Sequence, residues 1–153
     1  MVEFKEAFKE RVSRITTWES FCSACEKEPR KAIRVNTLKS SVEEIKKRLK
    51  DWNLEQVPWC HEGFWYEQPG RTLIGNTLEH HLGLIYVQDA SSMIPPVVLL
   101  PEPGDIVLDV AASPGSKTTQ LAMYMKNTGL LIANDVSDER LTPLGANLQR
   151  CGV

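Results

Sequence analysis

The chain has 153 residues, of which 42% are hydrophobic and 25% are charged, and its formal net charge is −2. These values are ordinary for a soluble globular protein, and no apolar run approaches the roughly 20 residues that a membrane-spanning helix needs. The first residues mix charged and apolar side chains and lack the apolar core of a signal peptide. We therefore expect a cytoplasmic protein that has no membrane partner.

The charge is unevenly distributed along the chain. Residues 1–50 contain 13 Lys and Arg against 8 Asp and Glu, a balance of +5, whereas residues 51–153 contain 5 against 12, a balance of −7. A basic segment ahead of an acidic one suits a protein that contacts RNA backbone with one part and a cofactor with the other. For the run from Lys46 to Lys50, a solvated helix face explains the charge equally well.

Two helices are predicted at the N-terminus. Apolar residues recur at helical spacing between Phe4 and Ile15, which predicts an amphipathic helix over residues 3–15. A second helix is expected over residues 18–27, and Pro29 ends it. After this point the pattern changes to short strands.

The next region alternates short strands with short helices. Ser41-x-x-Glu44 is a capping box, which predicts a helix that begins there and continues through Leu49. Asn76 is expected to start a short helix, and Asp89 to cap another. The predicted strands are residues 32–36, 54–59, 63–67 and 84–88, with 73–74 as a further segment that pairs with 63–67.

Prolines separate this region from a second one. Pro95, Pro96, Pro101 and Pro103 interrupt the chain after residue 93. We therefore predict a small α+β module over residues 1–90 and a different domain over 91–153.

The second domain begins as a parallel α/β fold. A strand over 106–110, a helix over 115–126 and a strand over 130–135 are followed by a helix from Ser137, with Pro143 expected to kink or delay that last helix. Two α/β repeats do not make a covered parallel sheet. We therefore expect an incomplete domain, either a fragment of a longer protein or a truncated gene product.

The cysteines and histidines do not form a metal site. Cys22 and Cys25 make one C-x-x-C pair without a second pair, and such a pair is weak support for zinc. Free cysteines on a helix commonly pack as small apolar groups. His80 and His81 have no carboxylate pattern around them, so we expect them to cap or pack, and we predict no metal.

The loop after the strand 106–110 carries the main functional signal. DVAASPGSKTT, from Asp109 to Thr119, is a strand end, a tight turn and a helix start, an arrangement that presents backbone N–H groups to a ligand. Asp135 follows Asp109 by 26 residues and ends the next strand. A carboxylate at that place hydrogen-bonds a ribose diol in βαβ folds. The pattern predicts a nucleoside-cofactor site.

Other nucleotide sites fit less well. A dinucleotide fingerprint needs three glycines, and Gly115 is the one glycine in this loop. A P-loop ATPase needs two glycines where the chain has Ala111 and Ser116, although Lys117 matches. A doubly wound α/β domain with a Pro-Gly turn and no such ligand stays open as an alternative.

Several sequence blocks together resemble a known family. Besides DVAASPGSKTTQ, the chain has ANDVSDERL and NLQRCGV, and before them AIRVNTLK at 32–39, VPWCHEGFWYE at 57–67 and GNTLEHHLGLIYVQDASSM at 75–93. In this order they resemble the RNA 5-methylcytosine methyltransferases of the NOL1/NOP2/Sun family, which use S-adenosylmethionine (SAM). The form of the loop, with Ala at its third place and Ser before Lys117, resembles the bacterial 16S rRNA branch. The resemblance covers the N-terminal part of that family.

The resemblance implies a fold and a set of cofactor residues. The expected fold is α/β: a small α+β N-terminal module, then the first part of a Rossmann-like SAM-dependent methyltransferase domain. Asp135 is expected to accept both ribose hydroxyls, and Asp109 to orient the loop. The loop expected around SAM consists of Ala111, Ala112, Ser113, Pro114, Gly115, Ser116 and Lys117.

The resemblance also bears on catalysis and RNA. A Cys thiolate adds to cytosine C6 so that C5 can attack the methyl group, and the family places its cysteines after the fourth and fifth strands, beyond Val153. We therefore name no catalytic residue. Trp59, Phe64, Trp65 and Tyr66 form either a stacking surface for a base or part of the core. The candidates for RNA backbone contacts are Arg30, Lys31, Arg34 and Asn36.

The function implied is SAM-dependent methylation of cytosine C5 in RNA, with ribosomal RNA favoured over tRNA. A tRNA enzyme of the same family is one alternative. Since the chain lacks the expected nucleophile, a non-catalytic RNA- or SAM-binding remnant is another.

Overall fold

Residues 4–153 are described by a computed structural model, in which the chain divides into two compact units, residues 1–30 and 31–153. In the first unit, α1 (Glu6–Ser13) and α2 (Trp18–Cys25) are the two predicted helices. The prediction began at residue 3, which lies outside the described residues. Stacked and edge-on aromatic rings join the two helices, namely those of Phe4, Phe8, Trp18 and Phe21.

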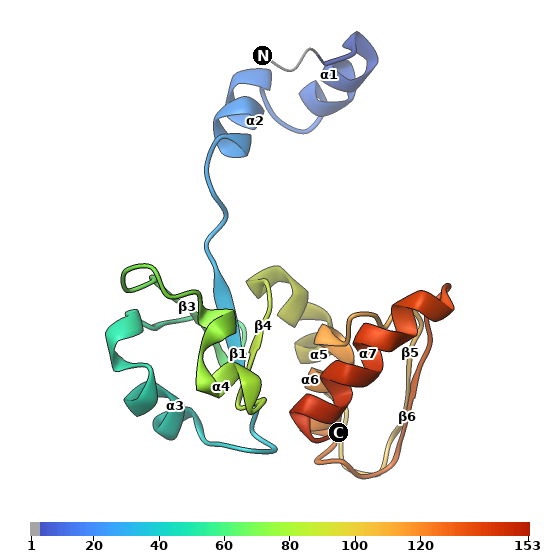
Figure 1. The fold of residues 1–153 in the computed structure, drawn as a ribbon. Helices are drawn as coiled ribbons and strands as arrows, with labels where there is room; N and C mark the ends of the chain where they lie inside the picture. Colours follow the sequence, from blue (N-terminus) through green and yellow to red (C-terminus); the bar gives the residue numbers. More distant parts are fainter. Residues whose placement is uncertain (1–3) are drawn as a thin grey trace. The chain divides into compact units, whose positions relative to one another are not determined.

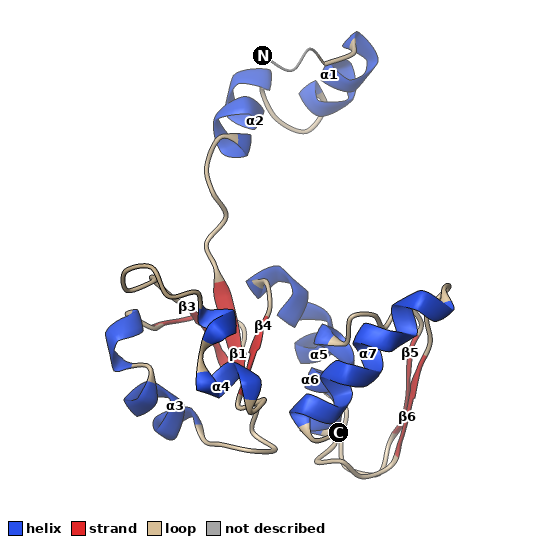
Figure 2. Ribbon diagram, in the orientation of Figure 1, coloured by secondary structure: helices blue, strands red, loops and turns tan. Residues whose placement is uncertain are grey.

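The second unit begins with a four-stranded antiparallel sheet. Its strands are β1 (Ala32–Val35), β2 (Glu55–Gln56), β3 (Gly63–Trp65) and β4 (Ile85–Val87), in the order β2-β3-β1-β4 (Figure 2). Helix α3 (Val42–Arg48) follows β1, and the hydroxyl of Ser41 accepts a hydrogen bond from Glu44 N at 3.1 Å, as the capping box predicted. The four strands predicted at 32–36, 54–59, 63–67 and 84–88 are present, although shorter than expected.

Both faces of the central strand β1 are buried. Successive side chains of a strand point to opposite faces, and all four residues of β1 are buried. Ile33 and Val35 belong to a core with α3, which includes Ile45, whereas Ala32 packs in a second core with Met93. A strand that reads as alternating apolar and polar therefore has no solvent face.

One local prediction between β3 and residue 93 is wrong and two hold in part: the helix that carries His80 and His81 begins at Leu78 and not at Asn76, and Asp89 occupies the N-cap position of the helix after it. Residues 73–74 do not pair with β3, because Ile74 begins a 3-10 helix that buries its side chain in the core. The next helix, α4 (Leu78–His81), begins after Thr77, whose hydroxyl accepts from His80 N. Asp89 precedes a 3-10 helix (Ala90–Met93) but makes no side-chain capping bond.

The remaining elements build a parallel α/β arrangement. After α5 (Ile94–Leu99) come β5 (Ile106–Asp109), α6 (Ser116–Tyr124), β6 (Leu130–Ala133) and α7 (Asp138–Cys151). β5 and β6 pair in parallel, and α6 covers one face of the pair through Leu121 and Met125. Figure 1 shows α6 and α7 between β4 and the β5–β6 pair, so these helices lie between the two sheets.

The other face of β5 and β6 is exposed in the structure. Ile106 is 77% exposed and Leu108 57%, and Ile132 on the neighbouring strand is 46% exposed. The two strands therefore have a helical layer on one face and exposed apolar side chains on the other. Helix α7 begins at Asp138 and includes Pro143, so the predicted late start is wrong. None of the helices among the described residues is long and apolar enough to cross a membrane.

Candidate functional site

The loop from Ala111 to Lys117 connects the end of β5 to the start of α6. Asp109, the last residue of β5, contacts both ends of the loop: its carboxylate accepts from Ala111 N at 3.4 Å and from Thr118 Oγ1 at 2.7 Å. Gly115 has a φ of 107°, a left-handed conformation that favours glycine, and its N–H donates to Ala112 O at 2.7 Å. Asp109 thus orients the loop, as the sequence predicted.

The first residues of α6 face the loop with unpaired donors. An α-helix has no intrahelical partner for its first N–H groups, and these groups with the helix dipole favour an anion. Lys117 lies in this first turn, and its ammonium group makes no hydrogen bond or ion pair within residues 4–153. The turn therefore offers backbone N–H groups and one cation to a carboxylate or phosphate.

Asp135 lies beside the same loop, two residues after β6. Its Oδ2 accepts from Ser113 N at 3.0 Å and its Oδ1 from Val136 N at 2.8 Å. The Arg140 guanidinium lies 3.5 Å from Oδ1, and the Asp135 side chain is 2% exposed while that of Arg140 is 54% exposed. Of these three contacts, the one with Arg140 is the longest and involves the most exposed side chain.

Polar side chains from other elements hold the loop from outside. Pro114 O accepts from Asn147 Nδ2 on α7 at 2.8 Å and from the Tyr86 hydroxyl on β4 at 3.3 Å. Ser116 O accepts from Arg34 on β1 at 2.7 Å. Tyr86 and Asn147 were not selected as site residues from the sequence. A polar side chain between apolar neighbours, as at Tyr86, was the signal that could have indicated a buried hydrogen bond.

The structure separates the four candidates for RNA contact. Arg34 and Asn36 are 0% and 1% exposed, and both are hydrogen-bonded inside the unit, so they present no surface to an RNA backbone. This burial corrects the expectation for these two residues. Arg30 and Lys31 are exposed and stay candidates.

The aromatic residues of the strand region also differ in how far they are exposed. Phe64 is 1% exposed and belongs to the core, whereas Trp59 is 41% exposed. Trp59 Nε1 donates to Ala90 O at 2.9 Å and its ring meets Trp65 edge-on. Tyr66 is partly buried against the core. Trp59 is thus the aromatic side chain of this group with the most exposed surface.

Cys60 and Cys151 are too buried to act as nucleophiles. Cys60 and Cys151 are 2% and 1% exposed, and burial raises the pKa of both thiols. A nucleophilic cysteine needs an accessible thiolate. Cys22 and Cys25 lie on α2. Within residues 4–153 no group of three or more His, Cys, Asp or Glu side chains is placed to hold a metal ion.

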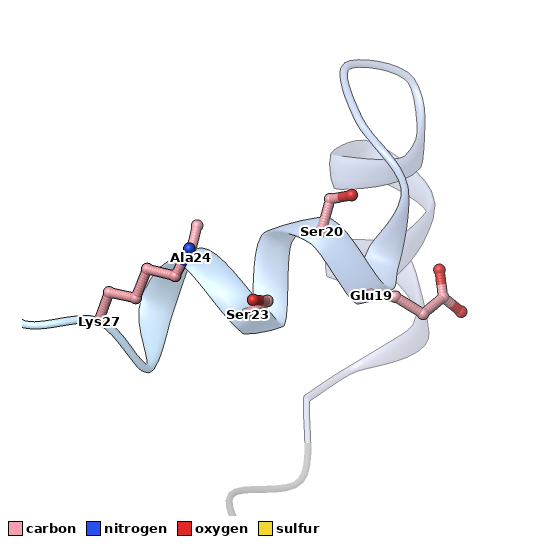
Figure 3. Close-up of a pocket in the computed structure, with 5 residues that line it drawn as sticks. All are labelled: Glu19, Ser20, Ser23, Ala24 and Lys27. Carbon is pink, nitrogen blue, oxygen red and sulfur yellow. The ribbon is translucent and has the colours of Figure 1, made fainter.

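A hollow of about 540 Å³ lies along α2, far in sequence from the loop. It is lined by Glu19, Ser20, Ser23, Ala24 and Lys27. Figure 3 shows that all five side chains come from a single helix, α2, and the residue stretch just after it. Ligand sites need convergent polar groups in a concave pocket, so this hollow is not a candidate for the site.

Comparisons with known proteins agree with the loop geometry. The N-terminal domain of the 16S rRNA methyltransferase RsmF matches residues 2–90, and the model of 16S rRNA methyltransferase RsmB/F matches residues 96–153. The chain belongs to the RsmF family of 16S rRNA methyltransferases. The resemblance to bacterial 16S rRNA enzymes is thereby confirmed.

Curated relatives within the RsmF family support this assignment. Ribosomal RNA small subunit methyltransferase F from Vibrio parahaemolyticus serotype O3:K6 is 50% identical over 161 residues, which cover 99% of this chain and 34% of the relative. The protein of the same name from Aliivibrio fischeri strain MJ11 is 52% identical over 141 residues, 88% of this chain and 30% of the relative. The chain thus spans about a third of the length of these relatives.

Solved structures share the fold of this RsmF-family chain. A methyltransferase homolog protein from Pyrococcus horikoshii is 39% identical, with a TM-score of 0.82, over 98% of this chain and 54% of that one. NSun6 from the same organism, solved with the SAM analogue SFG, has a TM-score of 0.86 at 20% identity, over 98% of this chain and 63% of that one. The second likeness concerns the fold alone.

Proposed function

We propose that this chain supplies the cofactor-binding front part of a SAM-dependent enzyme that methylates cytosine C5 in ribosomal RNA. The observation that carries the proposal is the loop 111–117, which meets the N-terminus of α6 on one side and Asp135 on the other. The family membership and the names of the relatives favour ribosomal RNA over tRNA as the substrate.

The residues present fit SAM. The unpaired N–H groups at the start of α6, together with Lys117, match the carboxylate of the methionine part. Asp135 matches the ribose diol once Arg140 leaves Oδ1. Small side chains at 111–113 let the backbone approach the cofactor closely. Bound SAM would supply an activated methyl group; the residues of this chain bind and orient it.

The proposed RNA side is limited to exposed basic residues. Arg30 and Lys31 precede β1 and are exposed, in a segment with an excess of Lys and Arg. Phosphate contacts of this kind position an RNA without reading its sequence. We assign the thiolate step of the family to neither Cys60 nor Cys151, because both are buried.

The proposal is tested by SAM binding to the full chain, measured by calorimetry. Asp135→Ala is expected to weaken binding by about 1.5–3 kcal/mol, the contribution of a hydrogen-bonding partner that carries charge. Asp138→Ala is the matched control: it removes an exposed carboxylate three residues away, in the first turn of α7. Equal SAM affinity of the wild type and Asp135→Ala removes Asp135 from the site. Binding of Mg-ATP in place of SAM would restore the P-loop alternative.

A further inference from the structure

The segment Arg34–Lys39, RVNTLK, carries three polar side chains that leave the four-stranded sheet and end on α6 and α7. Arg34 is in β1, and Asn36 and Lys39 are in the turn after it. We call residues 34–39 the RVNTLK segment. Its contacts lie within the unit 31–153.

Arg34 is fully buried and holds the first turn of α6. Its guanidinium donates to Ser116 O at 2.7 Å, to Thr119 Oγ1 at 2.8 Å and more weakly to Gln120 Oε1 at 3.4 Å. Gln88 Oε1 on the strand side accepts at 2.6 Å. Burial lowers the pKa of Arg34 to about 10, so the group is charged at neutral pH. A planar guanidinium with several acceptors fixes direction as well as distance.

Asn36 and Lys39 hold the other helix at its C-terminal end. Asn36 Nδ2 donates to Cys151 O at 2.8 Å, and Lys39 Nζ donates to Arg150 O at 2.7 Å. Carbonyls in the last turn of a helix lack intrahelical partners, and the helix dipole favours a cation there. The backbone approaches closely at this point: a Cβ on Gly83, before β4, would collide with Arg150 O.

The two helices held in this way both contact the loop 111–117. Helix α6 begins at Ser116 inside the loop, and α7 begins three residues after Asp135. Asn147 on α7 and Tyr86 on β4 both donate to Pro114 O within the loop. The RVNTLK segment therefore contacts the loop directly, through Ser116, and also fixes the end of the helix that carries Asn147.

We propose that Arg34, Asn36 and Lys39 are positioning residues for the cofactor, which hold the loop 111–117 in its binding conformation before SAM arrives. The inference rests on the proposed function, since it assigns a role toward the same ligand. Loops held in the bound conformation lose less conformational entropy on binding, so their affinity is higher. The RVNTLK segment then serves the cofactor and not the RNA backbone.

The experiment compares SAM affinity and local hydrogen exchange in full-chain variants. Arg34→Lys keeps the charge but loses the fork, and it is expected to raise the SAM Kd about tenfold, or 1.4 kcal/mol. Lys39→Met removes the ammonium group of an exposed side chain and is expected to raise the SAM Kd about threefold. In both, exchange should increase locally, at the first turn of α6 for Arg34→Lys and at the last turn of α7 for Lys39→Met. Affinities are measured at a temperature where circular dichroism shows every variant folded, so that lost stability alone does not change them.

Arg48→Lys is the matched control. Arg48 is in the same sheet-and-helix region, but its contacts are Glu44 and Glu79, not α6 or α7. It should bind SAM with wild-type affinity. If the wild type binds SAM and both Arg34→Lys and Lys39→Met bind it equally well, the positioning role is overturned while the proposed function stands. If Arg34→Lys does not fold, Lys39→Met decides. A wild type that does not bind SAM overturns the proposed function and, with it, this role.

Discussion

The two faces of β1 are both buried, but by different contacts. On one face Ile33 and Val35 pack against α3 through contacts that have no required direction. On the other, Ala32 packs in a second apolar core, and beside it Arg34 makes hydrogen bonds to α6, each with a required distance and angle. The same strand thus packs in an apolar core on one face and, on the other, holds the backbone of Ser116 in the loop 111–117.

The largest expected effect on stability comes from removing the Arg34 side chain and its hydrogen bonds. Arg34→Ala should lower the free energy of unfolding by about 2–6 kcal/mol, because the buried acceptors Gln88 Oε1 and Thr119 Oγ1 lose their donor and each such loss costs about 1–3 kcal/mol. Urea unfolding measures this. Arg48→Ala, which breaks a partly exposed ion pair with Glu44, should cost at most about 1 kcal/mol. Equal losses of unfolding free energy in the two variants would mean that the buried hydrogen bonds of Arg34 stabilise the fold no more than an exposed ion pair does.

A smaller effect is expected on the apolar face. Ile33→Val removes one buried methylene and should cost about 1 kcal/mol of unfolding free energy. The Ile33 side chain lies on the face of β1 opposite Arg34 and packs against α3. SAM affinity should therefore stay at the wild-type value. Urea unfolding and calorimetry on the same sample test both statements. A change in SAM affinity would show that the two faces do not act separately.

The smallest effect on stability is expected just before the strand. Lys31 is exposed, so Lys31→Ala should change the free energy of unfolding by less than about 0.5 kcal/mol. It should reduce the slope of RNA affinity against salt concentration by about one. Lys50→Ala, at another exposed lysine, should leave the slope unchanged if the contact is specific to the start of β1. RNA binding by the wild type that does not depend on salt would contradict a backbone contact.

Local chemistry was readable from the sequence. The spacing of apolar residues, the capping box at Ser41 and the Pro-Gly turn at 114–115 each depend on neighbours within a few residues, and the structure has the corresponding elements. The contacts of Asp109 with Ala111 and Thr118 follow for the same reason. The sites for SAM at 111–117 and Asp135 stay predictions, which the proposed experiments address.

Only the tertiary structure decided which polar residues face water. In sequence, Arg34 and Lys31 are two basic residues of one strand region, three positions apart, and both suggested an RNA contact. Pairing of β1 between β3 and β4 turns the Arg34 side chain toward α6, which lies 82 residues later in the chain at Ser116. A contact across that separation leaves no periodic signal, because burial of a polar face depends on what packs over it. The sequence by itself determined the strands, helices and loop; packing of α6 and α7 against the sheet determined that the RVNTLK segment points inward.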